Sequence, residues 1–142
     1  MSSTAISPTL RQQIAERDRY RCSYCLTLEA VTGASFTIDH IVPEALGGQT
    51  TLENLCLACW PCNLRKGQRL VATDPETGEL VRLYHPNQQR WSDHFAWTAD
   101  GLLIVGRTPS GRATVSAFRM NDPERVSGRW IWMKAGYHPP TD

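Results

Sequence analysis

Two Cys-x-x-Cys pairs constrain the fold of this chain more than any other feature. Cys22 and Cys25 form the first pair, Cys59 and Cys62 form the second, and thirty-three residues lie between them. This spacing supplies four thiolates to one tetrahedral Zn²⁺. Four thiolates leave no open coordination position, so we predict a structural zinc ion. Such an ion contributes about 10 to 16 kcal/mol, which replaces the core that the front half is too small to build alone.

Two other interpretations of the cysteines remain open from the sequence. The pairs could be redox centres, or the thiols could be reduced core residues, although the two-pair spacing favours zinc. The fifth cysteine, Cys56, lies in the apolar run Leu55-Cys56-Leu57. We therefore expect it to be a small buried residue and not a fifth ligand.

Length and charge allow a compact globular protein but do not indicate its partner. The chain has 142 residues, 41% of them hydrophobic, and a formal net charge of +1. Basic and acidic residues are balanced in both halves, so any basic face for nucleic acid must be local. The N-terminal sequence has neither a basic segment followed by an apolar run nor a membrane-length apolar stretch. We expect a soluble cytoplasmic protein with no membrane partner.

In the front half we expect one helix before two strands in the sequence and one short helix after them. Ser7 and Pro8 predict a helix start, and the apolar stripe of Leu10 and Ile14 carries that helix to about residues 17–19. Alternation over residues 35–40 predicts a strand that ends at His40. A short strand is expected at residues 55–57 and a short helix at residues 62–67, which Gly67 ends.

The sequence pattern changes after about residue 70, where turn and strand signals replace the cysteine motifs. We therefore divide the chain into residues 1–70 and an extension over residues 71–142. A turn at residues 74–78 precedes a predicted strand at residues 80–84. Residues 95–97 and 102–105 predict a hairpin across an Asp-Gly turn, and helices are expected from Pro109 and Pro123. The tryptophans of this half could stack on bases, but core packing is the favoured interpretation. Three histidines lack partners at ligand spacing and are expected to be structural or surface residues: His85, His94 and His138.

The polar residues between and after the cysteine pairs predict a catalytic site. Asp39 and His40 are adjacent, Asn54 follows, and Asn63 comes directly after the last cysteine. A carboxylate and a carboxamide are oxygen ligands for Mg²⁺ or a similar ion, and the imidazole is a base. Phosphodiester cleavage needs a base to activate water and a cation to balance charge on the phosphate. An isolated Asp-His pair would more simply be a surface pair or a helix cap, so the prediction depends on the zinc frame.

These residues resemble the HNH endonuclease family in its four-cysteine version. The resemblance covers about residues 17–67, and its motifs are Asp39-His40-Ile41-Val42-Pro43, Gly47-Gly48, Asn54-Leu55 and Cys59-x-x-Cys62-Asn63-x-x-Lys66-Gly67. It implies an α+β fold in which a zinc-stapled ββα-metal, treble-clef-like HNH core carries an N-terminal helix and a C-terminal extension of hairpin and helices.

The resemblance also implies a role for each matching residue. His40 is expected to be the general base, Asp39 and Asn63 the ligands of a catalytic divalent ion, and Asn54 the residue that braces the loop and orients His40. We expect the His40 side chain to be exposed at the strand end. The third motif position is Asn63 where the family name implies histidine, although asparagine also occurs there in the family. An amide oxygen favours Mg²⁺ or Mn²⁺ as the catalytic ion.

Basic residues after the motif are candidates for phosphate contacts. Arg65 and Lys66 follow Asn63 on the short helix, and Arg69 comes shortly after. Arg65 and Lys66 could equally be ordinary solvated charges. A weaker version of the same expectation applies to Arg69 and to Arg17, Arg19 and Arg21.

The expected activity is metal-dependent hydrolysis of nucleic-acid phosphodiester bonds, with DNA as the expected substrate. One alternative is a catalytically weak, zinc-stabilised nucleic-acid-binding module, and another is a zinc-stabilised adaptor for protein interactions. Only the nuclease requires Asp39, His40 and Asn63. The sequence does not indicate an oligomeric state.

Overall fold

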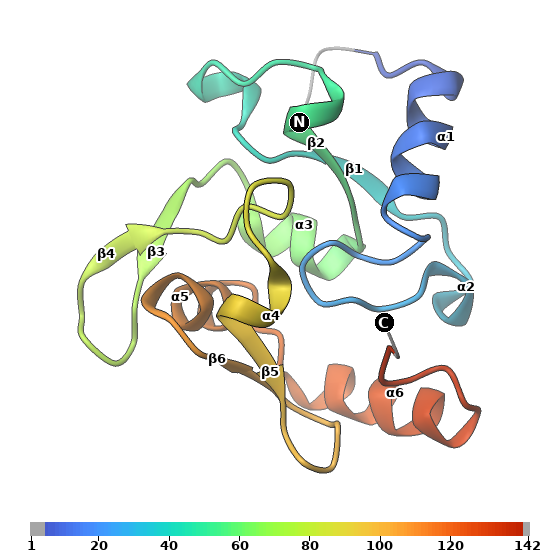
Figure 1. Ribbon diagram of the computed structural model, residues 1–142, viewed down its shortest axis with the longest axis vertical. Helices are drawn as coiled ribbons and strands as arrows, with labels where there is room; N and C mark the ends of the chain where they lie inside the picture. The colour runs from blue at the N-terminus through green and yellow to red at the C-terminus, as the bar shows by residue number, and fades with distance from the viewer. Residues whose placement is uncertain (1–4, 141–142) are drawn as a thin grey trace.

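A two-stranded antiparallel sheet followed by a short helix forms the centre of the front half (Figure 1). The computed structural model describes residues 5–140. β1 (Thr37–His40) pairs with β2 (Leu55–Ala58), and His40 lies opposite Leu55. α3 (Trp60–Lys66) follows β2 almost directly and contacts β1. This ββα order is the one expected from the sequence. The expectation that the N-terminal sequence carries no targeting segment concerns in part residues 1–4, which lie outside the described residues.

Local sequence signals account for the two longer helices of this half. α1 (Pro8–Arg17) begins after Ser7, whose side chain accepts a hydrogen bond from the Leu10 backbone N–H. That bond satisfies a donor that the helix itself cannot pair. α3 has Pro61 in its first turn and ends at Gly67, whose φ of 58° is one that glycine adopts at little cost. Both the expected start of α1 and the expected end of α3 are therefore present.

The extension contains two further hairpins and two helices. β3 (Val71–Thr73) pairs with β4 (Leu80–Arg82), and β5 (Phe95–Trp97) pairs with β6 (Ile104–Gly106). α5 (Pro109–Ala117) is capped by the Thr108 side chain, and α6 (Pro123–Lys134) begins after Asp122. The hairpin and both proline-initiated helices match the expected ones. β4 ends earlier than expected, and β3 was not expected, because three residues are too few to show an alternating pattern.

Four short elements were also not expected from the sequence. α2 (Glu29–Thr32) and α4 (Trp91–His94) are single helical turns, and neither has a side-chain cap. Two 3-10 turns, η1 (Glu44–Leu46) and η2 (Leu52–Asn54), lie in the connection from β1 to β2. Turns of this length have no stability of their own and are fixed by what packs around them.

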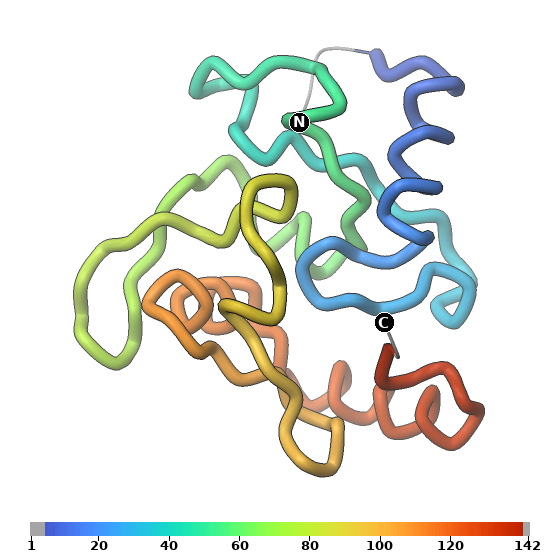
Figure 2. Tube along the Cα trace, in the orientation of Figure 1, coloured from blue at the N-terminus to red at the C-terminus, as the bar shows by residue number. Residues whose placement is uncertain are grey.

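Buried residues from both halves form one hydrophobic cluster. The Tyr24 ring packs edge-on against the Phe118 ring, with the centroids 5.0 Å apart. The Trp91 indole N–H donates to the Tyr24 carbonyl oxygen over 2.8 Å, so the start of α4 lies beside the first cysteine turn (Figure 2). Asn87 likewise donates to the backbone carbonyl of Leu55. The extension is thus in contact with the front half, while the division at residue 70 stays a prediction.

The aromatic residues of the extension mostly pack inward. Trp91 lies between Phe95 and Trp97, at centroid distances of 5.1 and 5.5 Å, whereas Trp130 on α6 is 53% exposed. His138 packs on Trp97 and contacts the Gly101 carbonyl. Among residues 5–140, the helices are all too short or too polar to span a bilayer.

Candidate metal and nuclease site

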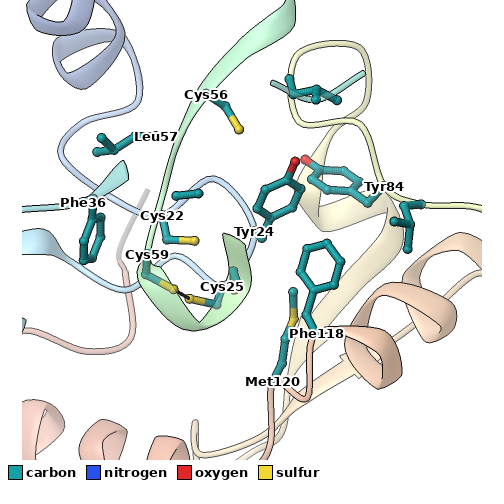
Figure 3. Packing of buried hydrophobic residues seen from close by; sticks show 14 of the residues in the cluster. Cys22, Tyr24, Cys25, Phe36, Cys56, Leu57, Cys59, Tyr84, Phe118 and Met120 are labelled. Atoms are coloured by element: carbon teal, nitrogen blue, oxygen red, sulfur yellow. Dashed lines mark hydrogen bonds between the residues drawn. The ribbon is translucent and has the colours of Figure 1, made fainter. Parts of the chain in front are cut away.

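Four buried cysteines bring their sulfur atoms together where the two halves meet. Figure 3 labels three of them, Cys22, Cys25 and Cys59. The ligand atoms of Cys22, Cys25, Cys59 and Cys62 all lie within 4.8 Å of one another. The Cys25 and Cys59 sulfurs are 3.6 Å apart, and all four thiols are free of disulfides. Four sulfurs at about 2.3 Å from a tetrahedral zinc would be about 3.8 Å apart, whereas a disulfide would need about 2.05 Å. The cluster therefore fits a structural Zn²⁺.

Backbone geometry aims each pair of sulfurs at the same point. The first pair lies in a tight turn in which the Leu26 N–H donates to the Cys22 carbonyl, and Leu26 itself has a φ of 63°. In the second pair, Cys59 precedes α3 as its N-cap and Cys62 lies in the first turn of that helix. The zinc cluster thus connects the turn after α1 to the helix that carries Asn63.

Cys56 does not belong to this cluster. Its side chain lies apart from the other sulfurs in Figure 3, it is fully buried, and it is absent from the group of possible ligands. Burial raises the pKa of its thiol well above the ordinary value, so it stays protonated and neutral. The structure agrees with the expectation that Cys56 is a core residue.

An arginine of the extension contacts the zinc-site sulfurs. Arg125 on α6 donates to the Cys62 sulfur over 3.1 Å and lies 3.8 Å from the Cys59 sulfur. Its other terminal nitrogen donates to the Phe118 carbonyl. Four thiolates around one Zn²⁺ carry a net charge of −2, which a neighbouring guanidinium partly balances.

Replacing Arg125 with methionine should therefore weaken zinc retention. Loss of a group that hydrogen-bonds a metal ligand typically lowers metal affinity by about 10- to 100-fold, so zinc transfer to a chromogenic chelator should be at least several-fold faster. Arg119→Met is the matched control, because Arg119 is 54% exposed and pairs with Asp122 at the surface. Equal zinc release from the two variants would contradict this role of Arg125.

Asp39 lies at the end of β1 in a buried polar network. It is 4% exposed, and its Oδ2 accepts a hydrogen bond from the Tyr24 hydroxyl over 2.7 Å. Its Oδ1 lies 3.2 Å from the ammonium nitrogen of Lys66. Burial raises the pKa of Asp39, whereas the Lys66 charge and the Tyr24 hydroxyl act in the opposite direction. Burial also raises the pKa of Tyr24, which keeps its hydroxyl protonated as the donor.

His40 lies at the strand end as expected, but it is not exposed there. Its side chain is covered, and the residue is only 7% accessible. The imidazole Nε2 contacts the Thr50 hydroxyl at 2.9 Å and lies 3.9 Å from a Glu44 carboxylate oxygen. The expected exposure was wrong because the connection over residues 43–50 folds back over the imidazole.

Asn54 holds that connection closed. Its side chain accepts from the Val42 N–H and donates to the carbonyls of Val42 and Gln49. The loop approaches so closely that a Cβ on Gly48 would lie 1.7 Å from the Val42 carbonyl oxygen. Only glycine fits at this position, which gives a physical reason for the Gly47-Gly48 pair.

Asn63 and Asp39 both face the same side of β1. The Asn63 amide nitrogen donates to the Thr37 hydroxyl over 2.8 Å, and Thr37 is two residues before Asp39 on the strand. Residues two apart on a strand share a face. A carboxylate and a carboxamide oxygen on one face are a donor set of the kind that Mg²⁺ or Mn²⁺ takes. That Asp39 and Asn63 hold one divalent ion there stays a prediction.

The three basic residues expected to contact phosphate differ in position. Arg65 and Arg69 are exposed, and Arg69 donates to the Arg65 carbonyl. Lys66 is 2% exposed, and its ammonium also donates to the His40 carbonyl over 2.9 Å. The Lys66 side chain therefore points toward the end of β1. A contact with the phosphate backbone of a nucleic acid would need it at the surface.

Sequence reasoning missed three partners of the site. Tyr24, Thr50 and Thr37 contact Asp39, His40 and Asn63, respectively. Tyr24 stands between the first two cysteines, where an aromatic residue gave no sign of which face it would take. The inward position of Lys66 had a usable signal, because residues three apart on a helix share a face and Asn63 precedes Lys66 by three.

A comparison with protein families matches residues 22–69, a third of the chain, to the family described as HNH endonuclease. The match contains both cysteine pairs and the strand, loop and helix that carry the polar site. The searches of curated proteins and of solved structures returned no match.

Proposed function

We propose that the protein is a metal-dependent endonuclease that hydrolyses phosphodiester bonds, with DNA as its substrate. The match of residues 22–69 to the HNH endonuclease family supports this proposal. The observation that supports this most is that Asn63 of α3 contacts Thr37, on the face of β1 that also carries Asp39, and that His40 follows Asp39 directly in the strand. A structural zinc cluster requires none of these three polar residues.

In this proposal Asp39, Asn63 and His40 have different roles. Asp39 and Asn63 hold a divalent ion, which when bound offsets negative charge on the phosphate and on the leaving oxygen. His40 takes a proton from the attacking water through Nε2. Because Nε2 now contacts the Thr50 hydroxyl, that hydroxyl has to give way to the water. Asn54 keeps the loop in register, and the exposed guanidinium groups of Arg65 and Arg69 contact the nucleic-acid backbone.

A plasmid-nicking assay with Mg²⁺, Mn²⁺ or EDTA tests the proposal. Asp39→Asn preserves shape and should lower metal-dependent cleavage by at least about 10²-fold, because several kcal/mol of charge stabilisation disappears. Asn63→Ala should reduce cleavage less, since a neutral amide contributes less charge. Asp93→Ala, at an exposed residue of α4, is the control, and zinc content should be equal in all variants.

One observation favours the second candidate, a catalytically weak nucleic-acid-binding module. His40 is covered, and the Asp39 carboxylate already has a cationic partner in Lys66. Wild-type protein that binds DNA but does not nick it above the protein-free background with Mg²⁺ or Mn²⁺ would support that candidate and reject the nuclease.

A further inference from the structure

Lys66 places a positive charge at the carboxylate that the proposed function assigns to a divalent ion. Its ammonium lies 3.2 Å from Asp39 Oδ1 and donates to the His40 carbonyl over 2.9 Å. The side chains of Lys66 and Asp39 are only 2% and 5% exposed, respectively. Asp39 Oδ2 is held by the Tyr24 hydroxyl. The Cys56 thiol lies 4.0 Å from the same oxygen, so one buried carboxylate faces one buried cation and two neutral donors.

A buried charge needs a partner, and this pair satisfies that requirement without any divalent ion. A divalent ion on the same carboxylate would stand next to the ammonium, and like charges this close in a poorly solvated site repel strongly. The two cations therefore compete for Asp39.

We infer that Lys66 is a built-in competitor of the catalytic ion: it neutralises Asp39 in the ion-free protein and leaves the carboxylate when a divalent ion binds. The inference rests on the proposed function, because it takes Asp39 to be a ligand of that ion. Its consequence is that the protein alone binds the ion weakly. A phosphate group beside the site would receive the displaced ammonium, so substrate and ion would enter together.

The position of Lys66 on α3 permits this exchange. It is the last residue of the helix, and Gly67 with a φ of 58° follows it. A displacement of this last side chain from Asp39 does not require the helix turn that holds Cys62 and Asn63 to unwind. Asn63 lies one turn earlier on α3 and can keep its contact with Thr37 of β1.

The chain offers a direct test because it contains only two lysines, Lys66 and Lys134. Zinc-loaded full-length protein with ¹⁵N-labelled lysine should show a protected ammonium signal from Lys66 by NMR. Lys134 lies over the Trp130 ring on α6 and gives the reference signal. Saturation with Mg²⁺ should shift or remove the Lys66 signal and leave that of Lys134 unchanged. A Lys66 signal that keeps its position while Mg²⁺ shifts the Asp39 backbone amide would overturn the inference.

Variants give an independent measurement of ion affinity. Lys66→Met should bind Mn²⁺ at least about tenfold more tightly than wild type, since the competing charge is gone. Lys134→Met should bind as wild type does. Unchanged or weaker Mn²⁺ binding by folded, zinc-loaded Lys66→Met protein rejects the competition. If this variant does not fold, the NMR experiment on wild type decides alone.

A double variant separates failure of this inference from failure of the proposed function. Adding Asp39→Asn to Lys66→Met should abolish the gain in Mn²⁺ affinity. Tight Mn²⁺ binding that survives in the double variant means that Asp39 is not a ligand, which rejects the proposed ion site itself. A gain lost in the double variant, with the wild-type Lys66 signal displaced by Mg²⁺, supports both.

Discussion

Replacing His40 with alanine should slow metal-dependent cleavage by roughly 10²- to 10⁴-fold, the usual contribution of a positioned general base. Within residues 5–140, the contacts found for the imidazole Nε2 are with side-chain oxygens at the loop, those of Thr50 and Glu44. Its removal therefore deletes a base and breaks no backbone contact in this part of the chain. Zinc content should not change, because His40 lies at one end of β1 and the second cysteine pair lies near the other end. Thr37 marks that other end, where it contacts Asn63 and pairs with Ala58. Initial rates of plasmid nicking, with zinc measured on the same preparation, give the comparison.

His94→Ala is the matched control for this substitution. His94 ends α4 in the extension, and its Nδ1 contacts the Thr108 hydroxyl, so it takes no part in the site on β1. Its loss should leave the cleavage rate within about twofold, as expected for a change away from the chemistry. Undiminished cleavage by pure His40→Ala protein would remove His40 from the mechanism.

Replacing Cys59 with serine should prevent stable folding. Binding of a structural zinc contributes about 10 to 16 kcal/mol, which is as large as the whole stability of many domains. Because the buried residues of both halves form one cluster, the loss should extend beyond the front half into the extension. Thermal unfolding and zinc content, measured on protein refolded with excess zinc, test this prediction.

Cys56→Ser provides a control with the same change of atom. Both cysteines are buried, at 0% and 4% exposure for Cys56 and Cys59, but only Cys59 belongs to the sulfur cluster. Cys56→Ser buries a hydroxyl and should cost about 1 to 3 kcal/mol while zinc stays bound. Similar unfolding temperatures for the two variants, with full zinc content in both, would show that Cys59 is not a ligand.

The parts of the fold that follow from the sequence are those with strong local signals. Ser7 and Thr108 cap the helices that their positions predict, and Gly67 ends α3. α2 and α4 could not be predicted, because a single turn has no periodicity and no cap. Such turns form only where tertiary contacts hold them.

The candidate site divides in the same way. The place of Asp39 and His40 at a strand end follows from the alternation before them, and the zinc spacing predicts that Asn63 returns to that strand. The burial of His40 does not follow, because it depends on how Asn54 and Gly48 draw the loop over the imidazole. Contacts across sequence separations of this kind leave no periodic trace in the sequence.

Tyr24 gives the extension a part in the chemistry of the front half. Its ring rests on Phe118, its carbonyl is held by the Trp91 indole, and its hydroxyl holds Asp39. Residues of the extension therefore support the Tyr24 side chain that holds Asp39. A substitution at Phe118 can change the position of Asp39 by moving the Tyr24 ring, although Phe118 itself does not contact Asp39. In the proposed endonuclease, substitutions at Phe118 should alter cleavage as substitutions at the end of β1 do. A protein shortened to residues 1–70 would lose the contacts that Phe118 and Trp91 make with Tyr24.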